Sequence, residues 1–280
     1  MWEAVKVVLD EEQAQRYSRH FVLREIGVGG QKKLLQSKVL VIGAGGLGSN
    51  AIMQLAAAGV GLLGIADCDR VDLSNLQRQT IHRTRDVGTE KVISAKRAVE
   101  ELNPDVAVQL HNERITVHNI REVIEQYDFV LDCTDRFETK FLINDACVLS
   151  KKAYSHAGAV RFEGQAMTYV PREGSAEKAP CLRCLLGSVP PIQDTVTCSQ
   201  AGVLGAVTAV IGSIQAMEAV KFLLGKGELL TGRVLRFDGL SMQVRVSEIP
   251  HADRHCAVCG ENPTVLSLTD NKEEYEAGCS

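Results

Sequence analysis

The sequence predicts an α/β fold with a doubly wound, Rossmann-like sheet that is mainly parallel. Short apolar runs rich in β-branched residues alternate with helix-like patterns over residues 38–150, which is typical of parallel βαβ units. A glycine-rich turn joins the first such run to the first helix pattern. In the C-terminal half, strand-like runs follow each other more closely, which predicts antiparallel strands that extend the sheet.

The nucleotide-binding half, residues 38–150, shows the alternation most clearly. Strands are predicted over 38–42, 61–66, 106–110 and 128–132, and helices over 49–58, 89–102, 118–126 and 138–150. Before this half, residues 10–36 predict a helical arm with Tyr17, Phe21 and Val22 on one side. The run is expected to break at Gly27, Gly29 and Gly30.

The second half, residues 151–260, predicts strands over 153–156, 165–170, 234–238 and 243–247 and a long helix over 203–224. A proline- and cysteine-containing loop spans 172–200, and loops of this length are usually functional or mobile. Residues 261–280 are expected to form a tail. We therefore predict a single domain over 1–280, with a four-cysteine zinc knuckle described below.

The composition argues against nucleic-acid and membrane partners. The chain has 280 residues, 45% of them hydrophobic, and a net charge of −4. Its start has no basic segment followed by an apolar stretch, so no secretory signal is expected and a cytoplasmic location is predicted. Residues 199–217 lack charge but contain several glycines and polar residues, which favours a buried helix over a membrane span.

The glycine-rich turn, Gly43-x-Gly45-x-x-Gly48, predicts a phosphate site. Glycines let the backbone approach a phosphate, and the following helix presents free N–H groups to it. Asp67, at the end of the next strand, suits hydrogen bonds to ribose hydroxyls. A glycine-rich connection without a ligand, and a dinucleotide-dependent oxidoreductase, remain alternatives from this pattern.

Polar and charged residues follow the second and fourth strands. Nucleotidyl transfer requires cations against the developing phosphate charge, which Arg78 and Lys91 can supply, and a carboxylate for Mg²⁺, which Asp135 can supply. Asp69 and Asn75 belong to the same stretch. A solvated polar loop with surface ion pairs is the alternative that spacing alone leaves open.

From Arg16 to Gly260 the chain resembles the MoeB/ThiF/HesA family, which is related to the ubiquitin-activating enzymes. The most specific run is Ser74-Asn75-Leu76-Gln77-Arg78-Gln79. The other matching motifs are Gly43-Ala-Gly45-Gly46-Leu-Gly48, Ala58-Gly59-Val60-Gly61, Asp67-x-Asp69-x-Val71, Val87-Gly88-x-x-Lys91, Asn103-Pro104, Asp132-Cys133-Thr134-Asp135, Glu163-Gly164-Gln165, Ala201-Gly202-Val203-Leu204-Gly205 and Gln215-Ala216-x-Glu218-Ala219-x-Lys221.

The resemblance implies an ATP-dependent adenylyltransferase that forms an acyl adenylate on the C-terminal Gly-Gly carboxylate of a ubiquitin-like sulfur-carrier protein. The carrier then becomes a thiocarboxylate for molybdopterin or thiamine synthesis or a related route, with sulfur from a separate donor protein. Residues 151–260 would bind the carrier. The implied site residues are Gly45 and Gly46 at the phosphates, Asp67 at the ribose, Asp69, Asn75, Arg78, Gln79 and Lys91 around the nucleotide, Asp135 at Mg²⁺, and Arg19, which would enter the neighbouring subunit of a homodimer.

Two alternatives to this function remain, an NAD-dependent oxidoreductase and a non-catalytic subunit of a heterodimeric activating enzyme. The second tends to lack residues equivalent to Arg78, Lys91 and Asp135, which are present here. The chain departs from the family pattern at Arg136, where relatives commonly have Asn, at Lys140, where many have Arg, and at Ala206, where many have Pro. The first two departures put the details of carrier and phosphate contacts in doubt.

The nine cysteines include two C-x-x-C pairs, Cys181/Cys184 and Cys256/Cys259. Four thiolates can form a closed structural zinc site, although four unrelated thiols would also satisfy the spacing. The family resemblance implies zinc at these four positions. It also implies that Cys198 is a possible sulfur-transfer thiol, whereas Cys68, Cys133 and Cys147 are expected to be packing residues and Cys279 to lie in a frayed tail.

Overall fold

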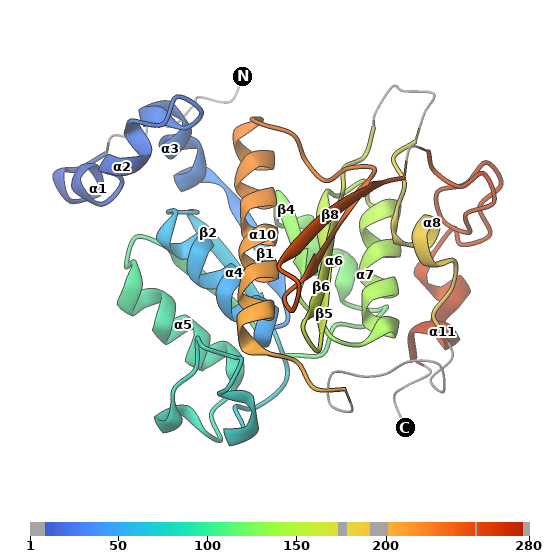
Figure 1. The fold of residues 1–280 in the computed structure, drawn as a ribbon, viewed down its shortest axis with the longest axis horizontal. Coiled ribbons are helices and arrows are strands. Elements are labelled where there is room, and N and C mark those ends of the chain that lie inside the picture. The colour runs from blue at the N-terminus through green and yellow to red at the C-terminus, as the bar shows by residue number, and fades with distance from the viewer. Residues whose placement is uncertain (1–8, 173–177, 191–200, 250, 277–280) are drawn as a thin grey trace.

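The structure is a computed structural model that describes residues 9–172, 178–190, 201–249 and 251–276 (Figure 1). Its centre is one eight-stranded sheet with the order β3-β2-β1-β4-β5-β6-β7-β8. The strands are β1 (Lys38–Ile42), β2 (Leu62–Ala66), β3 (Ala107–His111), β4 (Phe129–Asp132), β5 (Tyr154–Val160), β6 (Glu163–Tyr169), β7 (Arg233–Asp238) and β8 (Gln243–Glu248).

The direction of the strands changes along the sheet. β1 pairs in parallel with β2 and β4, β2 with β3, and β4 with β5, whereas β5, β6, β7 and β8 pair antiparallel. The predicted fold class is therefore confirmed. β5 and β6 are longer than predicted because they form a tight hairpin, in which Val160 pairs with Glu163 and Arg161 takes a left-handed φ of 53°.

Helices cover both faces of the sheet. Alternate residues of β1 point to opposite sides: Val39 and Val41 pack with α4 and α10, while Leu40 and Ile42 pack with α6 and α7. The helices are α1 (Glu11–Arg16), α2 (Ser18–Phe21), α3 (Gly27–Gln36), α4 (Gly46–Ala57), α5 (Lys91–Leu102), α6 (Ile120–Glu125), α7 (Phe137–Leu149), α8 (Leu182–Leu186), α10 (Gly205–Leu224) and α11 (Lys272–Glu276), with short 3₁₀ turns η1 (Leu73–Asn75), η2 (Thr84–Asp86) and η4 (Leu268–Asn271).

α10 is the one helix in the described part of the chain that is long and apolar enough to cross a membrane by length and composition. Half of its most apolar window is buried inside the protein. A Cβ on Gly212 would lie 2.3 Å from the carbonyl oxygen of Leu47, so this glycine lets the backbones of α10 and α4 touch. These contacts agree with the predicted core helix.

The N-terminal arm differs from its prediction in two respects. Gly27, Gly29 and Gly30 do not break the helical run but form the start of α3. A Cβ on Gly30 would lie 3.1 Å from Leu224, so close packing against the end of α10 explains this glycine better than a chain break does. Tyr17 is buried, but Val22, which is predicted to lie on the same side of the arm, is 78% exposed.

Residues 261–276, the described part of the predicted tail, are not a loose tail. The Tyr275 side chain is 5% exposed, and its hydroxyl donates to Asp145 of α7 at 2.5 Å. Cys279 lies outside the described residues. The C-terminal segment is therefore part of the packed domain.

Candidate functional site

The glycine-rich turn connects β1 to α4, and two of its glycines are sterically required. Gly43 has a φ of +98°, and a Cβ there would lie 2.7 Å from the carbonyl oxygen of Cys133. A Cβ on Gly48 would lie 1.8 Å from the carbonyl oxygen of Gly43. The turn is therefore tight enough for α4 to begin at Gly46, three residues before the predicted start at Ser49.

The first turn of α4 is chemically suited to an anion. The cap residue is Gly45, no side chain of the described residues caps this end, and no acidic residue lies in the first turn. The first N–H groups of a helix have no partner within the helix and carry partial positive charge. Gly45 and Gly46 are half-buried, so this end is open to a phosphate from outside.

Asp67 links the glycine turn to the end of β2. Its carboxylate accepts hydrogen bonds from the backbone N–H of Ala44 at 2.8 Å and from that of Asp69 at 2.9 Å. A carboxylate has about four acceptor positions, and the half-buried Asp67 keeps some of them available. The predicted ribose contact is thus compatible with the observed geometry.

Lys91, the first residue of α5, forms an ion pair with Asp69 at 2.8 Å. The lysine side chain is 7% exposed and the aspartate side chain is 65% exposed. The pair therefore holds a nearly buried ammonium beside the end of β2, close to Asp67. This places the predicted phosphate cation at the same sheet edge as the glycine turn.

The loop that contains η1 lies between the glycine turn and the start of α10. Within it, the Asn75 side chain accepts from the backbone N–H of Asp72 at 3.1 Å, and Arg78 donates to the carbonyl of Ser74 at 3.1 Å. Gln79 is 4% exposed, and its Oε1 has no partner among the described residues. Its Nε2 lies 3.7 Å from the position of a Cβ on Gly45, so Gln79 borders the phosphate turn directly.

Asp135 follows β4 and is exposed, as expected for a residue that meets a ligand at the strand ends. Its turn adjoins the glycine turn, because Gly43 lies against the peptide between Cys133 and Thr134. The structure therefore brings Gly45, Gly46, Asp67, Asp69, Asn75, Arg78, Gln79, Lys91 and Asp135 to one edge of the sheet.

A buried hydrogen-bond network around Asp132 fixes the turn that carries Asp135. Asp132 is fully buried and accepts from the Lys140 ammonium at 3.2 Å, the His156 Nδ1 at 2.8 Å and the Thr134 hydroxyl at 2.7 Å. Burial alone would raise the pKa of Asp132, but Lys140 and the His156 hydrogen bond outweigh it and lower the pKa to about 2. Thr134 also donates its backbone N–H to this carboxylate, at 3.1 Å.

The network changes the interpretation of Lys140. Its departure from the family pattern puts the details of the carrier and phosphate contacts in doubt, but its side chain is 6% exposed and also donates to the carbonyl of Ala157. Lys140 therefore neutralises Asp132 inside the domain. Arg136, the other departure, is exposed and lies 3.7 Å from Glu138 at the start of α7.

Replacing Lys140 with methionine is expected to lower the free energy of unfolding by about 3–5 kcal/mol at pH 7, because it leaves a buried carboxylate without its cation. Since the folded pKa of Asp132 lies below its ordinary value of 3.8, the carboxylate stabilises the fold above about pH 4, and this contribution is lost as the pH falls toward 2. Urea unfolding at pH 7 measures the loss. Lys140→Arg, which keeps the charge, is the matched control, and equal stability of the two variants would contradict the pairing.

Arg19 lies far from these residues. It is exposed on α2, in an arm that packs against the C-terminal ends of α4 and α5, where Gln31 donates to Ala58 and Arg16 donates to Leu102. Helices that follow parallel strands run back along the sheet, so these ends lie at the amino edge of the strands. The glycine turn lies at the carboxyl edge, whereas α2 lies at the opposite edge (Figure 1). Arg19 on α2 therefore does not reach the site of its own chain.

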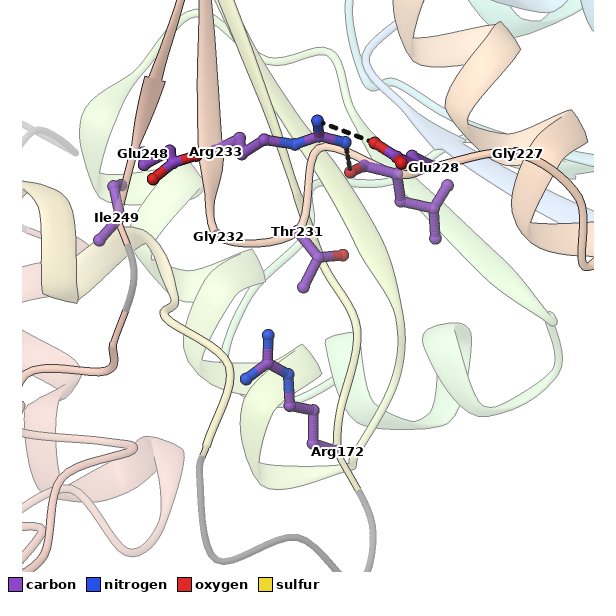
Figure 2. A pocket seen from close by; sticks show the side chains of 9 residues that line it. Arg172, Gly227, Glu228, Thr231, Gly232, Arg233, Glu248 and Ile249 are labelled. Atoms are coloured by element: carbon purple, nitrogen blue, oxygen red, sulfur yellow. Dashed lines mark hydrogen bonds and ion pairs between the residues drawn. The ribbon is translucent and has the colours of Figure 1, made fainter.

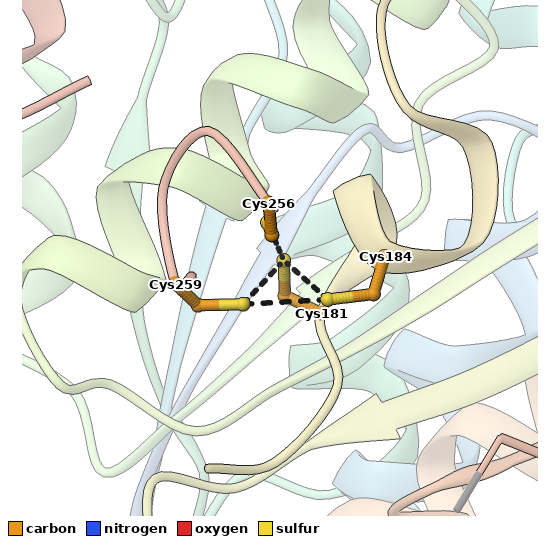
Figure 3. A group of neighbouring side chains, drawn as sticks. All are labelled: Cys181, Cys184, Cys256 and Cys259. Carbon is orange, nitrogen blue, oxygen red and sulfur yellow. Dashed lines mark hydrogen bonds between the residues drawn. The ribbon is translucent and has the colours of Figure 1, made fainter. Parts of the chain in front are cut away.

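The two C-x-x-C pairs converge although they are far apart in the sequence (Figure 3). The four sulfur atoms lie within 4.8 Å of one another. Four individual separations are 3.9 Å (Cys181–Cys184), 3.7 Å (Cys181–Cys256), 3.3 Å (Cys184–Cys259) and 3.5 Å (Cys181–Cys259). Tetrahedral thiolates at the usual zinc–sulfur distance of about 2.3 Å are separated by about 3.8 Å, so this cluster could bind zinc.

Further contacts hold the two cysteine pairs in place. Asn144 of α7 approaches Cys181 at 3.8 Å, and the backbone N–H of Asp253 points to Cys184 at 3.3 Å. Arg183, between the first two cysteines, is 3% exposed and bonds Asp145 and Glu274, both at 2.7 Å. The cluster thus joins α7, α8 and α11.

Two of the three cysteines that were predicted to pack in the core are buried, and one is exposed. Cys133 and Cys147 are buried, and burial raises the pKa of both thiols, so they are packing residues as expected. Cys68 is exposed and does not pack in the core as predicted, because it follows the last buried residue of β2. Cys198 lies outside the described residues.

Two open cavities lie at the amino edge of the parallel strands, away from the glycine turn. One, of about 510 Å³, is lined by Arg172, Thr231 and Arg233 among others (Figure 2). The Arg233 guanidinium is paired with Glu228 at 3.2 Å and with the carbonyl of Leu229 at 2.6 Å. The other, of about 480 Å³, lies beside Asp128 and Lys152. Neither cavity contains a residue of the predicted site.

The family model that matches this chain is that of the ThiF family, over residues 17–258. The chain belongs to the ThiF family. The match covers almost the same range as the resemblance inferred from the motifs and confirms it.

Curated relatives agree with this assignment. The chain is 43% identical over 272 residues to the "Adenylyltransferase and sulfurtransferase MOCS3" of Culex quinquefasciatus, covering 97% of this chain and 60% of that protein. It is 40% identical over 269 residues to the "Sulfur carrier protein adenylyltransferase" of Thermus thermophilus, covering 96% of this chain and 97% of that protein. The chain therefore spans about 60% of the length of the MOCS3 relatives but nearly all of the bacterial one.

Solved structures support the fold alone. Crystal structures of E. coli MccB superpose with a TM-score of 0.75 for the complex with MccA-N7isoASN and 0.73 for the complex with ATP. Sequence identities are 24% and 23%, over 88% of this chain in both cases and 75% and 73% of the MccB chains.

Proposed function

We propose that this chain is an ATP-dependent adenylyltransferase that activates the C-terminal Gly-Gly carboxylate of a ubiquitin-like sulfur-carrier protein. The observation that carries the proposal is the uncapped start of α4 at Gly45 and Gly46, beside Asp67 and the nearly buried Lys91. The names of the relatives at 40% and 43% identity support the same reaction.

The chemistry requires alignment and charge neutralisation rather than a protein nucleophile. A carboxylate oxygen of the carrier attacks the α-phosphorus of ATP, the new oxygen–phosphorus bond forms as the bond to pyrophosphate breaks, and the carrier leaves as an acyl adenylate. The α4 N-terminus, Arg78, Lys91 and Asn75 hold the phosphates, while Gln79 and Asp69 support the turn and the lysine.

Mg²⁺ fits the carboxylate of Asp135, which is an exposed oxygen donor at the carboxyl end of β4. The ion would neutralise charge on the phosphate oxygens. Asp135 lies in a turn that the hydrogen bonds from Thr134 to Asp132 hold in place.

We also propose that the enzyme is a homodimer whose Arg19 completes the site of the neighbouring subunit. Within one chain α2 lies at the opposite edge of the sheet from the glycine turn, so Arg19 can act on ATP only in another copy. The exposure of this guanidinium is consistent with such a role.

The later steps of the proposal are those of a sulfur-transfer route in the cytoplasm. Residues 151–260 bind the carrier, a separate donor protein supplies sulfur, and the adenylated carrier becomes a thiocarboxylate for molybdopterin or thiamine synthesis or a related route. Cys198 is the candidate thiol for a covalent step, and the four-cysteine cluster holds a structural zinc ion.

ATP–pyrophosphate exchange tests the proposed reaction. We expect labelled pyrophosphate to enter ATP only when a carrier ending in Gly-Gly is present, and a carrier lacking the last glycine serves as the control. Failure of exchange with every carrier encoded in the same genome would remove the proposal.

A further inference from the structure

A buried chain of hydrogen bonds lies behind the glycine turn. His82 is 4% exposed, and its Nε2 lies 3.0 Å from the carbonyl oxygen of Ala44. Its Nδ1 lies 2.8 Å from the Ser94 hydroxyl, which is 3.0 Å from the carboxylate of Asp86. The chain thus joins the glycine turn to α5 and to η2, although no motif of the sequence indicates it.

Hydrogen-bond chemistry fixes the role of Nε2 in the His82 ring. The Ala44 carbonyl can only accept, so the Nε2 of His82 must carry a hydrogen. Burial lowers the pKa of His82, and nearby Lys91 lowers it as well, against the opposing effects of the Ala44 carbonyl, Asp67 and Asp86. The Ser94 hydroxyl donates to the Asp86 carboxylate, and its oxygen lies 2.8 Å from Nδ1.

Asp86 accepts further hydrogen bonds besides the one from Ser94. Its carboxylate accepts the backbone N–H of Arg83 at 2.8 Å and the Arg97 guanidinium at 3.1 Å. Asp86 therefore anchors η2 and α5 to each other, and Ser94 sits on α5 one turn after Lys91.

Both backbone polar groups of Ala44 are consequently hydrogen-bonded to side chains. Its N–H donates to Asp67 at 2.8 Å and its carbonyl accepts from His82 at 3.0 Å. The next two residues, Gly45 and Gly46, cap and begin α4. Glycines have wide conformational freedom, so the direction of these N–H groups depends on the fixed residue before them.

We propose that His82 is a positioning residue for the nucleotide: its Nε2–H fixes the Ala44 carbonyl and thereby aims the α4 N-terminus at the phosphates. His82 acts through Ala44 and does not touch the ligand. The inference rests on the proposed use of ATP at this turn, and it assigns a role to a residue outside the recognised nucleotide motifs.

A pair of substitutions separates positioning from packing. In His82→Gln, the amide nitrogen can occupy the place of Nε2 and donate to Ala44; in His82→Asn, the shorter side chain reaches only the place of Nδ1. We expect the KM for ATP in pyrophosphate exchange to rise about 10-fold in His82→Asn, which is the usual consequence of losing one buried hydrogen bond. The KM should rise less than about 3-fold in His82→Gln, and kcat should change less than about 2-fold in both variants.

His111→Asn is the matched control, because His111 is also buried and its Nε2 bonds the Tyr127 hydroxyl, at 2.8 Å, rather than the glycine turn. It is expected to lower the melting temperature without changing the KM for ATP. The inference is overturned if His82→Asn and His82→Gln have equal KM values, or if both lose only thermal stability. Absence of exchange in the unmodified chain would instead overturn the proposed function, so the two failures are distinguishable.

Discussion

Asp135→Asn is expected to reduce ATP–pyrophosphate exchange by about 100-fold or more while leaving the melting temperature unchanged. Removing one preorganised group that stabilises the charge of the transition state typically lowers kcat by about 10²–10³-fold. In this site the stabilising charge is that of the Mg²⁺ ion that Asp135 is proposed to hold. Asparagine keeps the shape of the side chain but lacks the negative charge that holds Mg²⁺. The fold should tolerate the change because Asp135 is exposed and the turn is fixed by Asp132 and Thr134.

Asp105→Asn provides the matched control for this experiment. Asp105 is also exposed, but it precedes β3 and lies at the amino edge of the sheet. Its variant should exchange pyrophosphate at the rate of the unmodified chain. Full activity of Asp135→Asn over a range of Mg²⁺ concentrations would refute the proposed metal role of Asp135.

The sheet could be predicted because its central strands are buried on both faces. β1 and β4 therefore read as uninterrupted apolar runs, and their predicted ends agree with the structure to within one residue. Helix starts were less predictable. α3 and α4 begin on glycines, whose low helix propensity argues against a helix unless close packing or a ligand requires them.

The sequence predicted those residues of the candidate site that belong to short local motifs. The turn at Gly45, the carboxylate of Asp67 and the cation of Lys91 could be found from motifs. The contacts behind them could not, because they join distant positions: His82 bonds Ala44, and His156 bonds Asp132. The role proposed for Arg19 comes from the family resemblance alone, because α2 lies at the opposite edge of the sheet from the glycine turn.

The four-cysteine cluster leads to the largest expected effect on stability. Cys256→Ser is expected to lose the bound zinc and to melt at a much lower temperature than the unmodified chain. Structural zinc sites in small domains contribute about 10–16 kcal/mol of apparent binding free energy at pH 7, which is comparable to the whole stability of a domain, about 5–15 kcal/mol.

The reason lies in what the cluster connects. Cys181 and Cys184 flank the start of α8, and the segment that carries Cys256 and Cys259 leads on to α11, whose Glu274 bonds Arg183. Without the ion, only this ion pair, the Asp145 contacts and apolar packing hold the two segments on α7. We therefore expect chelation to release residues 178–189 and 251–276 before the central sheet unfolds.

Zinc content per chain, together with thermal unfolding in the presence and absence of a chelator, measures both parts of this prediction. Cys68→Ser is the control, because Cys68 is exposed and lies at the end of β2, away from the cluster. Its variant should retain one zinc ion and an unchanged melting temperature. A metal-free Cys256→Ser chain that melts like the unmodified protein would show that hydrogen bonds and apolar packing hold the C-terminal segment without a metal ion.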